Sequence, residues 1–397
     1  MLIGIVGKPN VGKSTFFKAS TLAEVEIANR PFTTIKPNEG VGFVRVDCAE
    51  KNFKVKCNPR QGFCIDGQRF VPVRLIDVAG LVPGAHVGKG LGNKFLSDLV
   101  QADVLIHIVD ASGSTDTEGK IVEPGSYDPV SDVKFIEEEL DKWFVSMLKE
   151  NWSKFVRQSL QKTLEKALAE QFYGFKITLE YVTKALRATK LDSKILINWN
   201  DDDIYRFASA VRSMSKPVVI AANKIDLPTA KKNIERLKKE FPKYLIVPCS
   251  AESELALREA AKSEIIKYIP GDDKFEILKP EKLNPVQKKA LDFISEKILK
   301  VWGSTGVQTC MNAAVFDFLK YIVIFPGGVN KLTDSQGRVL PDAFILPPRS
   351  TAYDFAAKIH TDFAKNFVAA IDVKTKRKIG RDAELKNLDV VEIMTSK

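Results

Sequence analysis

The stretch GKPNVGKST, residues 7–15, places two glycines, a lysine and a hydroxyl residue at the spacing of a phosphate-binding loop. Gly7 and Gly12 let the backbone wrap closely around phosphates, because side chains at these positions would clash. Lys13 is expected to reach the β- and γ-phosphates, and the Ser14 hydroxyl to ligate Mg²⁺. The predicted phosphate-binding residues are Lys8, Pro9, Asn10, Val11, Gly12, Lys13, Ser14 and Thr15.

The residues around this loop favour a phosphate site over a plain glycine-rich turn. The apolar run LIGIV before it suits a buried parallel strand, and TFFKASTLAE after it can form a helix. A helix that starts at the loop directs backbone N–H groups and partial positive charge toward an anion. The loop alone does not separate ATP from GTP.

Two further stretches could hold the metal and the γ-phosphate. VRLIDVAGL, residues 73–81, is a predicted strand that ends in Asp77, whose carboxylate can hold Mg²⁺, mostly through water. The backbone N–H of Gly80 can then meet the γ-phosphate. In RPFTTIKPN, residues 30–38, we expect Thr34, with Thr33 as the alternative, to close over Mg²⁺ and the γ-phosphate. Each stretch is also compatible with an ordinary strand and turn.

A fourth and a fifth stretch could select the base. In VVIAANKID, residues 218–226, the Asp226 carboxylate can accept from both N1 and N2 of guanine, a pattern that adenine does not present. Asn223 is expected to brace the neighbouring loops, and the Lys224 stem to cover the base. A backbone N–H in LIVPCSAES can bond the guanine O6; the predicted residues are Ser250, Ala251 and Glu252.

These five stretches follow the order and spacing of the G1 to G5 elements, and the chain resembles a translation-factor-class GTPase. GKPNVGKST, NRPFTTIKPN and DVAGLVPGAHVGKGLGNKFLSDLVQADVLIHIVD are similar to the Obg superfamily, and YDPVSDVKFIEEEL resembles YchF proteins. STAYDFAAKIH and DAELKNLDVVEI resemble a TGS domain, a ubiquitin-like β-grasp module. The resemblance implies GTP and GDP as ligands, Mg²⁺ as cofactor, and the ribosome or its RNA as partner.

Two features of the sequence qualify this resemblance. YchF proteins often carry an altered fourth element and prefer ATP, whereas NKID is intact here and favours GTP. Leu81 stands where many GTPases carry a water-orienting Gln, and it matches the hydrophobic substitution that the Obg superfamily shows at this position. Leucine cannot orient water by hydrogen bonding, so we expect slow GTP hydrolysis. The alternatives to a slow GTPase are a YchF-like ATPase and a scaffold that binds nucleotide with negligible turnover.

The catalytic candidates are Lys13, Thr34, Gly80 and His86. His86, a backbone group or a partner could position the water, and a solvent-exposed loop residue is the competing interpretation of His86. Asn10 could ligate K⁺, which supplies positive charge in several related GTPases, or simply brace the loop.

The elements that must position these residues predict an α/β fold: a P-loop NTPase G domain with a helical insertion, followed by a C-terminal β-grasp domain. Predicted strands near 2–6, 73–77, 104–110, 217–222 and 245–248 form a mainly parallel sheet. The expected domains are a G domain (1–125 and 212–275), a helical insertion formed by a two-helix hairpin (126–211), a linking helical segment (276–316) and the TGS domain (317–397). In the TGS domain we expect strands near 322–325, 343–346, 367–372 and 390–393, and a helix over 352–363.

The composition indicates the setting. Sixty Lys+Arg against 50 Asp+Glu give a net charge of +10, which fits an anionic partner such as RNA or, alternatively, a solvated surface. Basic residues of the insertion could touch RNA: Lys154, Arg157, Lys162, Lys166, Lys184, Arg187 and Lys190. Without a leader or an apolar run of membrane length, a cytoplasmic monomer with no membrane contact is predicted. Five scattered cysteines are expected as free thiols, and three histidines with no second Cys pair beside Cys57 and Cys64 argue against a zinc site.

Overall fold

The computed structural model describes residues 1–22, 38–78, 99, 101–150 and 152–396. Within them, seven strands form one sheet with the order β2-β4-β1-β5-β6-β7, and β3 pairs with β4. Strand β4 pairs with β1 in parallel, and β2 runs antiparallel to β4 at the edge of the sheet. The strands are β1 (Leu2–Val6), β2 (Glu39–Asp47), β3 (Phe63–Ile65), β4 (Gln68–Asp77), β5 (Val104–Asp110), β6 (Val218–Asn223) and β7 (Leu245–Pro248).

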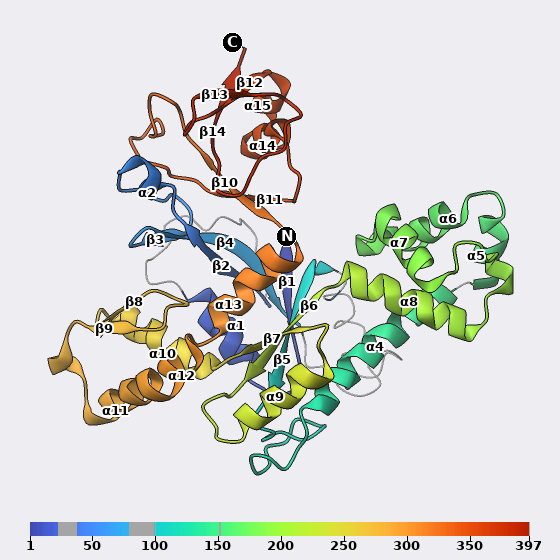
Figure 1. The fold of residues 1–397 in the computed structure, drawn as a ribbon, viewed down its shortest axis with the longest axis horizontal. Coiled ribbons are helices and arrows are strands. Elements are labelled where there is room, and N and C mark those ends of the chain that lie inside the picture. Colours follow the sequence, from blue (N-terminus) through green and yellow to red (C-terminus); the bar gives the residue numbers. More distant parts are fainter. Residues whose placement is uncertain (23–37, 79–98, 100, 151, 397) are drawn as a thin grey trace.

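Helices cover both faces of this sheet (Figure 1). Both faces of the central strands are apolar, so each needs a cover. One core joins the sheet to α4, α8 and α9, and a second core joins it to α1 and α13. The bounds are α1 (Lys13–Thr21), α4 (Val130–Lys149), α8 (Asp201–Ser215), α9 (Ala230–Glu240), α10 (Ala251–Lys262) and α13 (Val307–Asn312).

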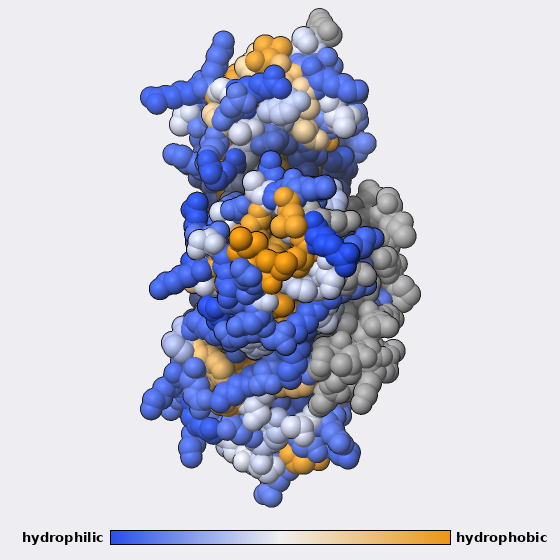
Figure 2. Space-filling view, turned by 90° about the vertical axis from the view of Figure 1, so that its right-hand side faces the viewer, coloured by the Kyte–Doolittle hydropathy of each residue, from blue (hydrophilic) through white to orange (hydrophobic). Residues whose placement is uncertain are grey.

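The helical insertion is larger than the expected two-helix hairpin, and that expectation is wrong. Besides α4 and α8, the described residues form α5 (Trp152–Ser159), α6 (Leu164–Gln171) and α7 (Leu179–Thr189), with 3₁₀ turns at Tyr173–Phe175 and Leu196–Asn198. Thr163 and Thr178 lie in extended backbone directly before α6 and α7, which separates the helices. Figure 2 faces this side and shows apolar side chains at its centre; exposed apolar residues of the insertion are Leu160, Tyr173, Leu179, Ile195 and Ile197.

A second helical region leads from the sheet to the C-terminal domain. The hairpin of β8 (Ile266–Tyr268) and β9 (Phe275–Ile277) is followed by a 3₁₀ turn, Pro280–Lys282. Helix α11 (Pro285–Phe293) continues through a π-helical turn, Ile294–Leu299, into α12 (Lys300–Trp302). Helix α13 leads into a second π-helical turn, Ala313–Phe318. The predicted domain limits stay predictions.

The C-terminal domain is a five-stranded sheet with the order β11-β10-β14-β12-β13 (Figure 1, top). Its elements are β10 (Ile322–Pro326), β11 (Phe344–Leu346), α14 (Ala352–Ile359), α15 (Thr361–Lys365), β12 (Phe367–Asp372), β13 (Arg377–Ile379) and β14 (Val390–Thr395). The single helix expected over 352–363 is interrupted, because His360 adopts extended backbone and its Nδ1 accepts the Asp362 N–H at the start of α15. Among the described residues, no helix combines the length and apolar character of a membrane span.

Candidate nucleotide site

The phosphate-binding loop lies between β1 and α1, and its glycines are required by geometry. Gly7 has φ 151° and Gly12 has φ 100°, in the region that favours glycine. A Cβ at Gly7 would lie 2.6 Å from the Ile108 carbonyl oxygen, and one at Gly12 would collide with Nδ2 of Asn223. The loop is therefore fitted closely between the ends of β5 and β6.

Lys13 and Asp77 interact electrostatically beside this loop. The Lys13 ammonium donates to the Lys8 carbonyl over 2.8 Å. Burial lowers the pKa of Lys13 and raises that of Asp77, and the attraction between the two charges works against both shifts. The residues predicted to meet the phosphates and the metal are thus a cation and an acid that attract each other.

The oxygen donors present fit a magnesium ion. Oδ1 of Asp77 is buried and has no hydrogen-bond partner in the described part of the chain. Ser14, the second residue of α1, is exposed and offers its hydroxyl at the helix N-terminus. Mg²⁺ prefers hard oxygen ligands and keeps several waters, so one carboxylate and one hydroxyl suffice on the protein side. The predicted ligand Thr34 lies outside the described residues, as do Thr33, Gly80, Leu81 and His86.

Asn223 joins the phosphate loop to the base-binding segments. Its side chain donates to the Val11 carbonyl over 2.8 Å and accepts the Ala251 N–H at 3.0 Å. The residue is only 4% exposed. Asn223 therefore holds together three segments that are more than 200 residues apart at the extremes, as the predicted bracing role requires.

In the segment after β7, one of the three predicted backbone donors has no hydrogen-bond partner among the described residues. Ser250 Oγ donates to Asp226 Oδ1 over 3.0 Å, which fixes that carboxylate. The Ser250 N–H donates to the Thr305 carbonyl, and the Ala251 N–H to Asn223. Of the three predicted donors, Glu252 is thus the one whose N–H has no such partner in the described structure. The site pairs a carboxylate acceptor with a backbone donor.

The sequence analysis missed Asp110, which organises the loop after β5. Its carboxylate accepts from Ser112, Ser114 and Thr115 and forms a 2.9 Å ion pair with Lys224. Although burial alone would raise it, these bonds leave the pKa of Asp110 below its ordinary value. Lys224 is therefore held by its ammonium group at the end of β5. A carboxylate at a strand end followed by ASGST was the sequence signal available.

Lys8 and Asn10 turn toward the same loop rather than toward the phosphate position. The Lys8 ammonium donates to the Thr115 carbonyl and to Asp132, both at 2.9 Å, and is 5% exposed. Asn10 Nδ2 donates to the Gly119 carbonyl over 2.9 Å. The Lys8 side chain is therefore already engaged away from the predicted phosphate position. Only the backbone N–H of Lys8 remains as a donor for a phosphate.

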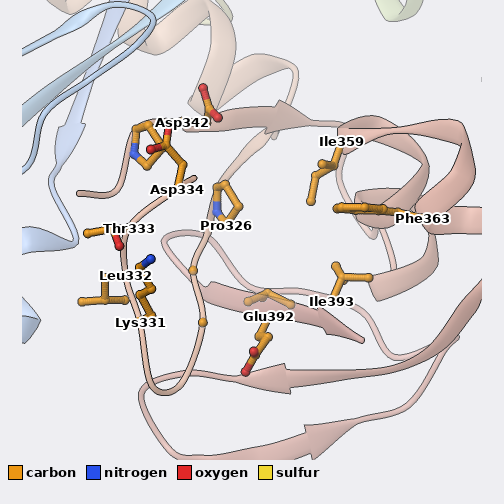
Figure 3. A pocket seen from close by; sticks show the side chains of 14 residues that line it. Pro326, Lys331, Leu332, Thr333, Asp334, Asp342, Ile359, Phe363, Glu392 and Ile393 are labelled. Atoms are coloured by element: carbon orange, nitrogen blue, oxygen red, sulfur yellow. The ribbon is translucent and has the colours of Figure 1, made fainter. Parts of the chain in front are cut away.

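A separate cavity of 280 Å³ lies in the C-terminal domain (Figure 3). Pro326 and Glu392 line it from β10 and β14, and Ile359 and Phe363 from the helices. None of the residues predicted to bind the nucleotide line this cavity. The nucleotide site is therefore assigned from its own hydrogen-bond donors and acceptors.

Comparison with known proteins identifies the parts of the chain. Residues 2–144 match the model of a 50S ribosome-binding GTPase, residues 221–328 an Obg-like GTPase YGR210-like, G4 motif-containing domain, and residues 336–395 a TGS domain. A GTP-binding protein of Methanocaldococcus jannaschii is 50% identical over 100% of this chain and 99% of its own length. The Obg-like ATPase 1 of Homo sapiens is 30% identical over 93% of this chain and 81% of its own.

Solved structures agree with this assignment. A GTP-binding protein from Pyrococcus horikoshii superposes with a TM-score of 0.77 at 39% identity, and covers both chains completely. The YchF GTPase of Schizosaccharomyces pombe has a TM-score of 0.59 at 22% identity over 99% and 97% of the two chains, which shows the shared fold. The predicted α/β fold, with a P-loop G domain and a C-terminal TGS domain, is confirmed. The chain belongs to the Obg-like family of GTP-binding proteins.

Proposed function

We propose that the protein is a guanine-nucleotide switch that hydrolyses GTP slowly with Mg²⁺. The observation that carries this is the arrangement of Asp226 and Glu252. The Asp226 carboxylate, held by Ser250, can accept hydrogen bonds from two donors of a base. The Glu252 N–H can donate one hydrogen bond to the same base. Guanine presents two donors and one acceptor on the matching edge, and adenine does not.

The metal and the phosphates use the opposite side of the site. Asp77 and Ser14 would hold Mg²⁺, which neutralises charge on the phosphates, and Lys13 would exchange its bond to the Lys8 carbonyl for a phosphate oxygen. Thr34 and Gly80 would close on the γ-phosphate and be released after hydrolysis. Leu81 supports slow turnover. The bond of Asn10 to Gly119 favours its bracing role over K⁺ ligation, although its oxygen could still ligate K⁺.

The proposed partner is the ribosome or its RNA. The name of the family model that matches residues 2–144 and the net charge of +10 support it. Two of the basic residues that could touch RNA form ion pairs with neighbouring carboxylates, Lys162 with Glu170 and Lys184 with Glu180. This reduces the positive charge of the insertion. The monomeric state and the cytoplasmic location stay predictions.

An ATPase is the second candidate, because relatives over 93% of this chain are named Obg-like ATPase 1. Calorimetric titration with GTP, GDP and ATP in Mg²⁺ separates the two. The proposal expects tight GTP and GDP binding and at least ~100-fold weaker ATP binding, since a mismatched buried polar edge costs several kcal/mol. Asp226→Asn should lose GDP affinity and gain affinity for xanthosine diphosphate. Tight ATP binding, insensitive to Asp226→Asn, would overturn the guanine assignment.

A further inference from the structure

Three of the five cysteines meet one glutamate at the outer end of β2 and β3. Cys48 directly follows β2, Glu50 begins the short helix α2 (Glu50–Phe53), Cys57 lies in the next loop, and Cys64 belongs to β3. All are free thiols, and the four ligand atoms lie within 4.8 Å of one another. We call these four residues the Cys₃Glu cluster. The sequence argument against a zinc site considered only Cys57 and Cys64, and the fold supplies the two donors that it lacked.

Two distances within the cluster are close to those between donors around a single ion. Sγ of Cys48 lies 3.6 Å from Sγ of Cys57, and Sγ of Cys64 lies 3.5 Å from Oε1 of Glu50. Zinc bound to sulfur at ~2.3 Å and to oxygen at ~2.0 Å gives tetrahedral edges of ~3.8 Å between sulfurs and ~3.5 Å between sulfur and oxygen. Both measured separations fall near these edges.

Groups outside the cluster orient its ligands. The Cys57 N–H donates to Oε2 of Glu50 over 2.7 Å, which leaves Oε1 directed toward Cys64. Nη1 of Arg69, a fully buried side chain, donates to Sγ of Cys57 over 3.8 Å. Metal ligands are commonly held in this way by hydrogen bonds from a second layer of residues.

The surroundings favour ionised thiols and give a metal access. A cavity of 390 Å³ is lined by Cys57 and Cys64 together with Lys51, Lys54 and Lys56. The Arg69 guanidinium, which donates to Cys57, reduces the cost of negative charge on that sulfur. Cys48, in contrast, is 1% exposed, so the cluster has one buried wall and one open side.

We propose that the Cys₃Glu cluster binds one zinc ion as a structural site. Zn²⁺ accepts thiolate and carboxylate ligands together, favours tetrahedral coordination, and in structural sites takes all four ligands from the protein. Binding releases the thiol protons to solvent and involves no change of oxidation state.

The site fastens the segment that contacts the C-terminal domain. Between Cys57 and Cys64, the Asn58 N–H donates to the Val339 carbonyl and the Arg60 N–H to the Pro341 carbonyl, both over 2.8 Å. Arg69, which contacts the Cys57 sulfur, also donates to the carbonyls of Leu340 and Pro341. Metal binding therefore orders the backbone that carries the contact between the two domains (Figure 1).

The first test is metal binding by the full chain. The protein is purified without a metal-affinity step, treated with chelator and reductant, and titrated with Zn²⁺ or Co²⁺. The expected result is one bound ion per chain by mass spectrometry and a thiolate-to-cobalt charge-transfer band. Cys64→Ser should weaken binding at least ~10-fold, and Glu50→Gln should weaken binding but keep the band, because it keeps the three sulfurs. Cys310→Ala is the matched control, since Cys310 is buried away from the cluster beside Cys249.

The second test concerns the fastening role. Trypsin cleaves after Lys54, Lys56 and Arg60, and chelation should speed cleavage there several-fold while cleavage elsewhere stays unchanged. GDP binding by each variant shows that the G domain remains folded. The zinc site is overturned if the folded, reduced chain takes up no ion, or if Cys64→Ser binds as tightly as Cys310→Ala. The site is also overturned if Cys48 and Cys57 are found joined in a disulfide and the protein takes up no metal once that bond is reduced. Unchanged trypsin cleavage after chelation overturns the fastening role.

Discussion

Asn223→Ala should weaken nucleotide binding although the residue need not touch the nucleotide. The side chain is 4% exposed and makes two hydrogen bonds, of 2.8 Å to the Val11 carbonyl and 3.0 Å from the Ala251 N–H. Each such bond contributes ~1 kcal/mol, and a buried partner left unsatisfied costs ~1–3 kcal/mol. We expect the free energy of unfolding to fall by about 2–4 kcal/mol.

The effect on affinity follows from the same contacts. Without Asn223, the phosphate loop at Val11 and the base segment at Ala251 are no longer fixed to each other. Binding must then order them, and every 1.4 kcal/mol weakens affinity tenfold. We expect GDP affinity to fall roughly 10-fold to 100-fold, measured by calorimetric titration. Denaturant unfolding, followed by tryptophan fluorescence, gives the stability change.

Asn233→Ala is the matched control for this experiment. Asn233 is also a buried asparagine, 9% exposed, and makes one hydrogen bond, of 2.9 Å, to the Ala111 carbonyl. It should cost about 1–2 kcal/mol of stability and leave GDP affinity unchanged. If Asn223→Ala binds GDP as tightly as the parent protein, or if Asn233→Ala weakens binding equally, the bracing argument is refuted.

Three further predictions concern buried charges. His107 is fully buried, and burial, with Lys13 and Lys8 nearby, lowers its pKa to about 3. Below pH ~6.5 the unfolded chain binds a proton on His107 that the folded chain does not bind, so the free energy of unfolding falls as the pH drops, by about 2 kcal/mol at pH 5. His107→Gln should remove this part of the pH dependence, measured by denaturant unfolding. Lys8→Met leaves the Asp132 carboxylate buried and uncompensated, and should cost about 3–5 kcal/mol, partly recovered by adding Asp132→Leu, in the same melts. Burial raises the pKa of Asp77, so its charged form costs stability at neutral pH; Asp77→Asn should raise the Tm measured without nucleotide yet weaken Mg²⁺-dependent GTP binding.

The sequence located the parts of the site whose chemistry is local. Gly7 and Gly12 could be predicted because a phosphate loop needs glycines at fixed spacing beside a strand and a helix. The apolar runs placed the sheet strands within a few residues, since buried parallel strands leave a continuous apolar pattern. The breaks in the helical insertion escaped prediction, because apolar periodicity defines the face of a helix and not the residue where it ends.

Contacts between distant residues could not be predicted in the same way. Lys8 looked like a phosphate ligand from its place in the loop, yet its partner Asp132 lies 124 residues further along the chain. The Cys₃Glu cluster shows the same limit at shorter range. Cys48 and Glu50 join Cys57 and Cys64 only because the chain turns at α2 and returns as β3. No spacing rule encodes that return.

The order of strands in the sheet explains why the site has its layout. Parallel strands end at one edge, and the residues that follow β4, β1, β5, β6 and β7 are neighbours there in that order. Asp77, at the end of β4, lies beside the phosphate loop after β1, and the register pairs it with Ile5. On the other side, Asp110 at the end of β5 pairs with Asn223 at the end of β6, and Ser250 follows β7. Adjacent strands are ~4.8 Å apart, so the edge from β4 to β7 spans ~19 Å. The residues proposed for the metal, phosphate, bracing and base roles therefore follow one another along this edge, in an order that suits a nucleoside triphosphate.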